Sequence, residues 1–300
     1  MDRLEAMLIM VAVADGGSLS QASRKLKIPL ASISRKISEL EAHLNVKLLI
    51  RSTRSLELTD YGRSYVGHCR RILDDIEEAE RMVIGEYSAP RGLLTITAPV
   101  VFGKLHVIPI IAEFLNNFPE VNIQLLLTDS DLDLIEEKID LAVRIGDLAN
   151  STLIASKIGE IRHITCGSSF YFNKHGKPKI PQELNLHNCI NISAFGTAKN
   201  WVYYSNKGKM NIKIQPRLEV TTVEAGIEAA ALGVGITRAL SYQINYYLKN
   251  NKLEIILENY EPKPWPVHLV FASGRIIPNK LRSFLEFAKP KLKDHLIYIH

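Results

Sequence analysis

The sequence has few cysteines and no long apolar run. Its three cysteines, Cys69, Cys166 and Cys189, are odd in number, far apart and never arranged as C-x-x-C. Neither a disulfide framework nor a zinc site is therefore predicted. No stretch approaches the roughly 18 consecutive apolar residues that a membrane-spanning helix needs. The first residues carry Asp2 and Glu5 instead of a basic secretory leader. These absences predict a cytoplasmic chain with reduced thiols, no membrane contact and no metal.

Motifs of common catalytic sites are missing as well. The sequence contains no G-x-x-x-x-G-K-[ST], H-E-x-x-H or G-x-S-x-G, and its histidines are scattered. The segment GVGI at 233–236 lacks the G-x-G-x-x-G spacing and is interpreted as a helix-to-strand turn. Asp129, Asp131 and Asp133 stand where a helix is expected to begin, so capping of its first turn explains them. We expect no enzyme activity and no cofactor.

Length and composition predict an ordinary globular protein of several domains. At about 150 residues per domain, 300 residues predict two or three domains. The net charge of +5 is concentrated, because residues 24–54 contain eight basic side chains and only two acids, a local balance of +6. Such a cluster is typical of a surface that binds a polyanion, although basic runs are also common on solvated faces.

Residues 1–59 predict three short helices and a hairpin. Leu4, Leu8 and Val11 give the first helix one apolar stripe, and it ends at Gly16 and Gly17. We expect the second helix to begin with a serine N-cap, Ser20. The segment LLIRSTRSLELT is interpreted as a two-stranded wing with arginines at its tip.

The third predicted helix has one apolar and one polar side. Pro29 suits its first turn, and one narrow arc facing the other helices is made by Ile33, Ile37, Leu40 and Leu44. Ser32 and Arg35 project the opposite way. Glu39 and Glu41 are interpreted as the point where the helix leaves a phosphate-bearing surface, since phosphate repels acids.

A long helix is predicted over residues 60–87, with Thr59 as its cap. An apolar heptad frame runs through Leu58, Tyr65, Cys69, Ile72, Ile76, Ala79 and Val83, interrupted only by Gly62. A free-standing helix with such a seam needs a partner, and we expect the same helix of a second subunit. The alternative is packing against its own chain.

Residues 88–92, SAPRG, predict a hinge, and residues 93–300 predict a separate domain. Strand-like and helix-like segments alternate there, which is typical of an α/β domain with mainly parallel strands. The helix-like segments include DLDLIEEKI and a closing helix near 279–287.

Three helices, a basic third helix and an arginine-tipped hairpin favour a winged helix-turn-helix, because the major groove admits one α-helix. The alternative is a three-helix packing module. Ser32 and Arg35 are candidates for base edges, with arginine best matched to guanine. The candidates for positioning on the DNA backbone are Ser18, Ser20, Ser34, Lys36, Arg51 and Arg54.

The segment SLSQASRKLKIPLASISRKISELEAHLNVKLLIRSTRSLELTDYG resembles the DNA-binding module of LysR-type transcriptional regulators. The family sequence L-E-x-x-L-G-x-x-L-F-x-R followed by L-T-x-x-G appears here from Leu40 to Gly62, with Asn45 in place of glycine. The family's polar run at the start of the recognition helix is replaced by Pro29, Leu30 and Ala31. Leu30 is therefore expected to contact a thymine methyl or to pack, and the target sequence stays open.

The resemblance extends through RGLLTITAPVVFGKLHVIPIIAEFLNNFPEVNIQLLLTD, DLAVRIGDLANSTLIASKIG and AALGVGIT. It implies an α/β fold overall: a winged helix-turn-helix, a long linker helix and a two-lobed effector domain like a periplasmic binding protein. The cleft between the lobes would be lined by Thr97, Ala98, Val101, Phe102, Arg144, Gly146, Cys166, Ser193, Thr221 and Thr222.

Hydroxyls and helix N-termini in such a cleft favour an anionic effector such as a carboxylate. Arg144 has an alternative role as a structural ion-pair partner. Cys166 has an alternative role as a redox sensor, which would require exposure and a lowered pKa.

The resemblance implies a DNA-binding transcription regulator that responds to a small molecule. Its predicted partners are double-stranded DNA, a second copy of itself in a homodimer that pairs into a homotetramer, and RNA polymerase. The alternative is a cytoplasmic two-lobe solute-binding protein or enzyme whose first 87 residues only dimerise it.

Overall fold

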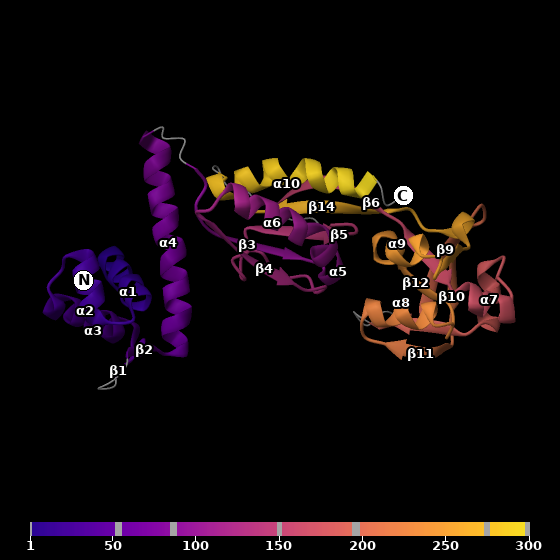
Figure 1. The fold of residues 1–300 in the computed structure, drawn as a ribbon, viewed down its shortest axis with the longest axis horizontal. Coiled ribbons are helices and arrows are strands. Elements are labelled where there is room, and N and C mark those ends of the chain that lie inside the picture. Colours follow the sequence, from indigo (N-terminus) through magenta and orange to yellow (C-terminus); the bar gives the residue numbers. More distant parts are fainter. Residues whose placement is uncertain are drawn as a thin grey trace. The chain divides into compact units, whose positions relative to one another are not determined.

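The computed structural model describes residues 2–51, 56–84, 89–148, 152–193, 199–272 and 277–297. Within these ranges, the side chains of residues 51, 74, 75, 78, 79, 81–84 and 297 are not described. The chain divides into two compact units, Met1–Leu93 and Leu94–His300. Each unit is considered by itself (Figure 1).

The first unit contains three short helices, a hairpin and one long helix. In chain order these are α1 (Arg3–Gly16), α2 (Leu19–Leu26), α3 (Leu30–Leu44), β1 (Leu49–Arg51), β2 (Leu56–Leu58) and α4 (Asp60–Ile84). The two strands pair antiparallel, with Ile50 opposite Glu57. The predicted helix-turn-helix is present, although α3 begins one residue after Pro29. Two strands of the predicted wing are present, and the long helix predicted over residues 60–87 is described as far as Ile84. The tip of the wing at 52–55 and residues 85–87 lie outside the described residues.

The core of the first unit follows the predicted pattern in α3 but not in α1. Ile33, Ile37 and Leu40 are buried as expected. In α1 the expected stripe is wrong, because Leu4 is 43% exposed and Leu8 is 45% exposed. Instead, α1 packs against α2, α3 and α4 and buries the opposite residues Ala6, Ile9, Met10, Ala12 and Val13.

The ends of α2 and α4 are fixed by side-chain caps. Ser18, not Ser20, is the N-cap of α2, since its Oγ accepts a hydrogen bond of 3.1 Å from Gln21 N. Thr59 Oγ1 accepts from Gly62 N at 2.9 Å and donates to Lys47 O at 2.8 Å. A Cβ on Gly62 would lie 2.1 Å from Leu48 O, so glycine is required at this close approach.

The predicted heptad frame of α4 divides into two parts. Leu58 lies in β2, and together with Tyr65 it packs against the core of the first unit. Cys69 is fully buried. These three residues therefore pack against their own chain, which was the alternative to packing against a second subunit. Ile72 is 40% exposed and Ile76 is half-buried. Ala79 and Val83 lie where side chains are not described.

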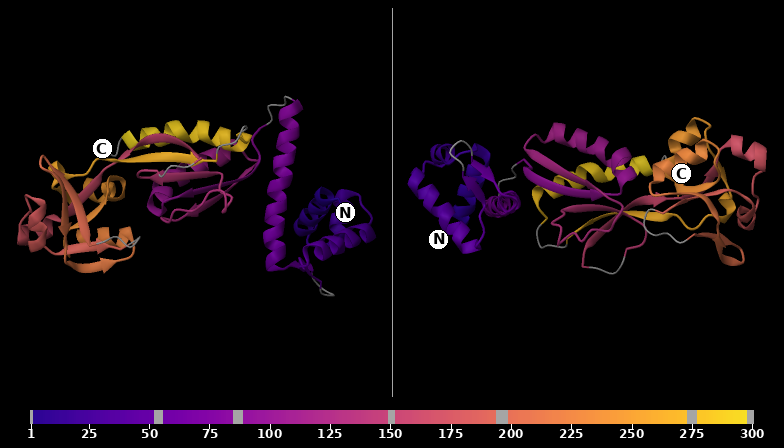
Figure 2. Two further views of the ribbon diagram at one scale, coloured as in Figure 1. Left: turned by 180° about the vertical axis from the view of Figure 1, so that it is seen from behind. Right: turned by 90° about the horizontal axis from the view of Figure 1, so that it is seen from below.

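The second unit begins with a lobe built on a five-stranded sheet of order β4-β3-β5-β14-β6. Its elements are β3 (Gly92–Ala98), α5 (Val100–Phe102), the π-helical turn η1 (Gly103–Val107), α6 (Ile108–Asn117), β4 (Val121–Leu127), β5 (Leu141–Ile145), β6 (Ile154–Ile161), β14 (Trp265–Phe271) and α10 (Asn279–Ile297). Helices α6 and α10 cover the large core on one face of the sheet. Figure 2 shows α10 lying along β14 and β6.

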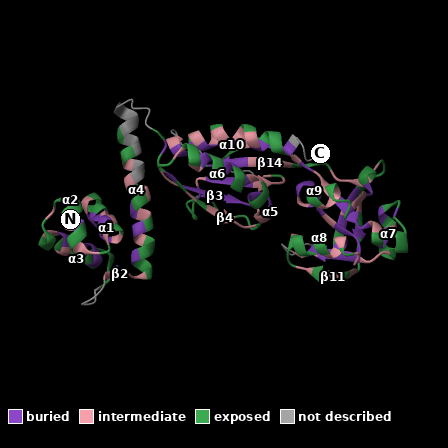
Figure 3. Ribbon diagram, in the orientation of Figure 1, coloured by how far each residue is buried: buried purple, intermediate pink, exposed green. Residues whose placement is uncertain are grey.

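The other lobe contains a three-stranded sheet of order β12-β7-β13, a parallel pair and a hairpin. Its elements are β7 (His163–Gly167), α7 (Ser169–His175), η2 (Pro181–Leu186), β8 (Cys189–Ile192), β9 (Asn200–Ser205), β10 (Gly208–Lys213), β11 (Pro216–Val220), α8 (Val223–Ala231), β12 (Thr237–Leu240), α9 (Ser241–Lys249), β13 (Glu254–Ile256) and η3 (Glu258–Tyr260). Figure 3 shows that buried residues concentrate on its central strands. The chain therefore crosses between the lobes twice, from β6 to β7 and from η3 to β14.

Three expectations for the second unit are corrected. Strands β3 and β5 pair in parallel, but β14 returns antiparallel between β5 and β6, so the sheet is mixed. The segment DLDLIEEKI forms turns and not a helix, with Asp133 Oδ1 accepting from Ile135 N and Glu136 N. The closing helix continues well past residue 287, to Ile297.

Candidate functional site

The turn between α2 and α3 is tightly fixed. Lys27 ends α2 in the left-handed conformation with φ 56°. Ser23 Oγ donates a 2.6 Å hydrogen bond to Ile28 O. Pro29 then precedes α3 with φ −54° and ψ 139°, which is extended backbone that cannot continue α2. These contacts set the angle at which α3 leaves the turn.

The outer side of α3 presents Leu30 and Arg35. Leu30 is 46% exposed. The Arg35 side chain is 71% exposed, and its only described ion pair is with Glu39 at 3.8 Å. Ser32 and Ser34 are half-buried on the same helix. A long, exposed guanidinium on the outer side of a helix can reach a guanine edge in the major groove.

The other predicted DNA contacts differ in their surroundings, and not all of them are available to bind phosphate. Lys36 forms an ion pair with Glu5 of α1, so its ammonium ties α3 to α1 and is not a free phosphate contact. Ser18 caps α2 and Ser20 is exposed. The side chain of Arg51 and the whole of Arg54 lie outside the described residues.

Glu41 has a structural role that the sequence interpretation missed. Its carboxylate is buried and accepts hydrogen bonds from Leu48 N at 2.9 Å, Leu49 N at 3.1 Å and Lys47 Nζ at 2.8 Å. Burial alone would raise its pKa, but these hydrogen bonds together lower it. Glu41 therefore joins α3 to the start of the hairpin and does not mark the edge of a phosphate-bearing surface.

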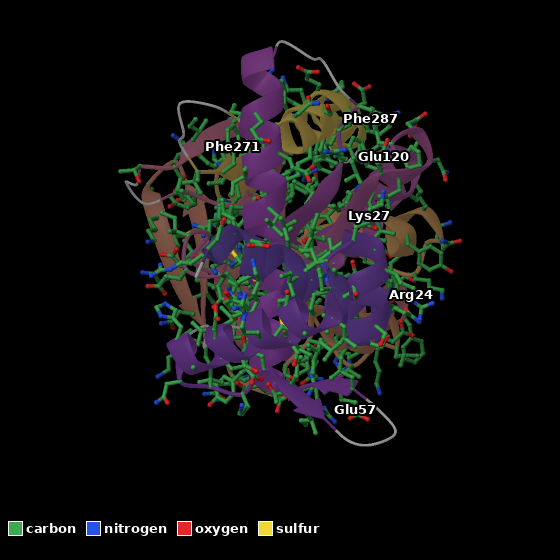
Figure 4. The ribbon with its side chains drawn as sticks, turned by 90° about the vertical axis from the view of Figure 1, so that its left-hand side faces the viewer. Arg24, Lys27, Glu57, Glu120, Phe271 and Phe287 are labelled. Atoms are coloured by element: carbon green, nitrogen blue, oxygen red, sulfur yellow. The ribbon has the colours of Figure 1, made fainter. Side chains whose placement is uncertain are left out.

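Further positive charge surrounds the turn. Figure 4 labels Arg24 and Lys27 near the C-terminal end of α2, and both side chains are exposed. Glu57, labelled on β2 in the same view, is an acid on the hairpin. Lys25 is 3.5 Å from Asp15. The exposed cations of α2 and α3 make this face suited to a nucleic-acid backbone.

A cavity of about 620 Å³ lies between the two lobes of the second unit. This is within the range of about 300–1,000 Å³ that is typical of small-molecule sites. Polar and aromatic side chains from both lobes line it, among them Thr97, Thr128, Asp129, Asp131, Arg144, His163, Asn191, Trp201, Tyr204, Arg238, Tyr242, Gln243 and Trp265.

Three of the predicted effector contacts, Thr97, Ala98 and Arg144, line this cavity. The other predicted contacts are not among the residues that line it. Val101 and Phe102 belong to the hydrophobic core of the sheet. The predicted effector contacts that do not line the cavity are Val101, Phe102, Gly146, Cys166, Ser193, Thr221 and Thr222.

The hydroxyls of Ser193 and Thr222 are hydrogen-bonded to the backbone. Ser193 Oγ donates to Val220 O at 3.2 Å, and Thr222 Oγ1 accepts from Ala225 N at 3.3 Å as the N-cap of α8. Gly146 N donates to Pro266 O at 2.8 Å. Each group therefore holds the fold of its own lobe.

Cys166 is fully buried among apolar neighbours. Burial raises the pKa of its thiol to about 12. A redox sensor needs an accessible thiol with a lowered pKa, so the redox alternative for Cys166 is not supported.

Arg144 is held within the first lobe. Its Nη2 donates to Leu132 O at 2.7 Å, and its Nε lies 3.8 Å from the exposed carboxylate of Asp131. Arg144 thus lines the cavity and also fixes the loop after β4, which combines both roles weighed for it.

Arg238 is the second cationic wall residue, on β12 in the other lobe. Its Nη2 lies 2.6 Å from His163 Nδ1, and its Cζ lies 4.9 Å from the centre of the Tyr203 ring. Its Nε is buried and has no hydrogen-bond partner among the described residues. Burial, then the charge of Arg238, lowers the pKa of His163 to about 3, so His163 is neutral.

Most cavity residues could not be identified from local sequence. Arg238, His163 and Trp265 stand on three strands separated by up to about a hundred residues, and only the crossing of the lobes brings them together. The sequence predicts that Asp129 and Asp131 cap a helix in their own segment, and that helix is absent. Both residues line the cavity, and Asp129 Oδ1 accepts a hydrogen bond of 3.0 Å from Val100 N, the first residue of α5.

Two known protein families match this chain, one in its N-terminal part and one in its C-terminal part. Residues 4–63 match the family of bacterial regulatory helix-turn-helix proteins of the lysR type. Residues 88–293 match the LysR substrate binding domain. The chain belongs to the LysR family of transcriptional regulators.

Relatives cover nearly the full length of this LysR family member. It is 32% identical over 99% of its chain to an HTH-type transcriptional regulator of Xanthomonas campestris, covering 87% of that protein. It is 30% identical to the HTH-type transcriptional regulator CrgA of Neisseria meningitidis serogroup B, over 97% of this chain and 98% of CrgA.

Solved structures agree with the fold. CrgA from Neisseria meningitidis matches with a TM-score of 0.62 and 29% identity, over 96% of this chain and 98% of that one. The full-length virulence activator AphB of Vibrio cholerae matches with a TM-score of 0.59 and 26% identity, over 95% of this chain and 98% of that one. The family binds DNA, forms oligomers and binds small-molecule effectors. Its members are transcriptional regulators and not enzymes.

Within the described residues, no helix is long and apolar enough to cross a membrane. The same residues contain no cluster of histidine, cysteine and acidic side chains that could hold a metal ion.

Proposed function

We propose that this LysR-type regulator reads two-fold DNA sites through residues 1–59. The observation that carries the proposal is the exposed guanidinium of Arg35 on the outer side of α3, beside the cations of α2. Arg35 would contact a base edge, with Ser32 beside it. Leu30, at 46% exposure, is placed to meet a thymine methyl. Ser20, Ser34 and the two hairpin arginines, Arg51 and Arg54, would position the protein on the DNA backbone.

Residues 60–87 would join two subunits, residues 88–92 would be a hinge, and residues 93–300 would hold the effector. Exposed apolar side chains support a subunit interface on the first unit. Leu4 and Leu8 of α1 and Ile72 of α4 are each 40% exposed or more, and α1 packs beside α4. Ile76, Ala79 and Val83 continue the apolar frame along α4.

Pairs of dimers would form a tetramer on DNA, and RNA polymerase is a further proposed partner at the promoter. Such a regulator would act in the cytoplasm. An effector in the cavity would change the arrangement of subunits on DNA, which is a coupling between two sites.

A mobility-shift assay with the full chain and duplex DNA from next to its own coding region tests the proposal. We expect a retarded complex whose affinity falls steeply as salt rises, because phosphate contacts release counterions. Footprinting should then protect a two-fold site. Absence of binding, or binding that hardly responds to salt, would contradict the proposal.

The alternative, a two-lobe solute-binding protein or enzyme that residues 1–87 merely dimerise, makes a different prediction. Removing residues 1–87 would then leave every biochemical activity intact. We expect instead that this deletion abolishes DNA binding.

A further inference from the structure

The cavity between the lobes has one cation that no described carboxylate neutralises. Arg238 donates to a neutral acceptor, His163 Nδ1, and its Nε has no partner among the described residues. Its other neighbour, Tyr203, has a pKa raised to about 12 by burial and is also neutral. A buried donor without an acceptor is costly, so the chain itself leaves the hydrogen-bonding capacity of Arg238 incompletely used. Because Arg238 also lines the cavity, its guanidinium can bind an acceptor from outside the chain there.

Glu261 is the carboxylate whose charge acts on Arg238, but it is hydrogen-bonded to a different arginine. Glu261 acts on Arg238 through its charge, but both of its oxygens accept hydrogen bonds from Arg162, at 2.8 Å and 2.9 Å. Arg162 therefore keeps Glu261 from closing onto Arg238. The planar fork of Arg238 keeps its charge at all ordinary pH values and matches a carboxylate in geometry.

The charges of the cavity are divided between its walls. The first lobe contributes Asp129 and Asp131, with Arg144 near Asp131. The second lobe contributes Arg238, and two exposed lysines that do not themselves line the cavity stand beside it on the hairpin of β9 and β10. Lys209 is paired across the strands with Tyr204 and Lys213 with Asn200, and both of these partners line the cavity. An anionic group is therefore favoured on the side of the second lobe.

Aromatic surfaces lie next to Arg238. Trp265 stacks on His163 with ring centres 4.7 Å apart and an angle of 26°. Trp201, Tyr204 and Tyr242 also line the cavity. Flat apolar walls around a few fixed polar groups are typical of sites for ring-shaped ligands.

We propose that the effector is an aromatic carboxylate whose carboxylate binds Arg238 and whose ring lies among the cavity's aromatic side chains. The proposal rests on the function proposed above, because it names the ligand class of the same cavity. It also assigns distinct tasks to the two cavity arginines: Arg238 binds the ligand, whereas Arg144 fixes a loop.

The chain provides its own optical probe. It contains two tryptophans, Trp201 and Trp265, and both line the cavity. Tryptophan fluorescence of the full-length protein should therefore report occupancy directly. Benzoate, phenylacetate and indole-3-acetate are titrated, each beside its uncharged carboxamide.

We expect at least one of the three carboxylates to change the fluorescence saturably, with its carboxamide binding roughly tenfold to hundredfold more weakly. This range corresponds to the loss of charge-assisted hydrogen bonds. R238Q should show the same loss for the carboxylate, and R238K, which keeps the charge without the fork, should bind at an intermediate level. R217Q removes an exposed arginine of the same lobe and should bind like the unchanged protein.

Three results would overturn the proposal: no saturable response to any of the three carboxylates, equal binding of a carboxylate and its carboxamide, or full affinity in R238Q. The comparison of carboxylate with carboxamide uses the unchanged protein, so it stands even where R238Q fails to fold. Carboxylate binding by a chain that does not bind DNA would contradict the proposed function alone. DNA binding with no response to carboxylates would contradict this inference alone.

Discussion

Arg162 and Glu261 form a two-point ion pair between the two connections that join the lobes. Nε of Arg162 lies 2.8 Å from Oε2 of Glu261, and Nη2 lies 2.9 Å from Oε1. Arg162 stands between β6 and β7, and Glu261 follows η3 on the way to β14. The pair therefore ties both crossings together where any movement of one lobe against the other must take place.

Arg162→Ala should weaken the second unit and its cavity together. The pair is mostly buried, at 25% and 10% side-chain exposure, so its loss should lower the free energy of unfolding by about 1–3 kcal/mol. The freed Glu261 can turn toward Arg238, so affinity for the aromatic carboxylate should also fall severalfold. Urea denaturation and fluorescence titration measure the two effects.

Lys157→Ala is the matched control, because Lys157 forms an exposed pair with Glu160 within β6, the strand that leads into the same connection. Exposed pairs contribute little, at most about 1 kcal/mol. Equal effects of the two substitutions would refute the role given to Arg162.

Glu41→Gln should destabilise the first unit by about 1–3 kcal/mol, since a buried charged acceptor of three hydrogen bonds is replaced. The folded pKa of Glu41 is lowered from 4.5. Its stabilising contribution is therefore present above about pH 4.5 and is lost as pH falls through the lower folded pKa. Chemical denaturation at neutral and acidic pH measures this.

Glu39→Gln serves as the comparison on the same helix, where the carboxylate is 47% exposed. It should change stability and its acid dependence very little. An unchanged acid dependence in Glu41→Gln would contradict the assignment.

Gly62→Ala should cost about 1–3 kcal/mol and distort the hairpin, because the new Cβ would meet Leu48 O. Gly67→Ala on the same helix meets nothing within 4 Å. It should stabilise α4 by roughly 0.5–1 kcal/mol, since alanine favours helix interiors. Thermal unfolding should therefore shift in opposite directions for the two substitutions.

Arg35→Ala should relax sequence preference, whereas Arg54→Ala should weaken binding to all sequences about equally. Arg35 is the proposed base contact, and Arg54, outside the described residues, is a predicted phosphate contact. Competition binding with mutated operator sequences separates the two effects. Identical profiles for both variants on every sequence would contradict this division of roles.

The three thiols should resist modification in the folded protein. Cys69, Cys166 and Cys189 are each fully buried, and burial raises the pKa of Cys166 and of Cys189 to about 12. We expect a thiol-reactive chromogenic disulfide to label them only after unfolding. Rapid reaction of any one of them under native conditions would show that its surroundings open readily.

The pattern of α3 could be predicted because one face of that helix meets the other helices. Ile33, Ile37 and Leu40 are buried as the spacing required, while Leu44 at the helix end is 37% exposed. The same method failed for α1, whose residues such as Ile9 and Met10 are surrounded by three helices. That helix has more apolar residues than one face can hold, so periodicity alone cannot predict which of them are buried.

The candidate site was less predictable than the fold. Arg144 could be anticipated through the resemblance to the LysR family, but Arg238 and Trp265 reach the cavity only through the pairing of distant strands. Glu41 also escaped detection, because a carboxylate on a basic helix gives no local sign of the backbone donors that fold back onto it.

The contact of Gly62 with Leu48 has a mechanical consequence. The first turn of α4 and the base of the hairpin are in direct contact, since Thr59 bonds Lys47 O and Gly62 lies on Leu48 O. The long helix cannot rotate about its axis without carrying the hairpin with it. In a dimer joined through α4, a small change in the angle between the two helices would shift both hairpins along the DNA. Since one helical turn of DNA is about 34 Å, such a shift would select between operators whose half-sites differ in spacing by a base pair or two.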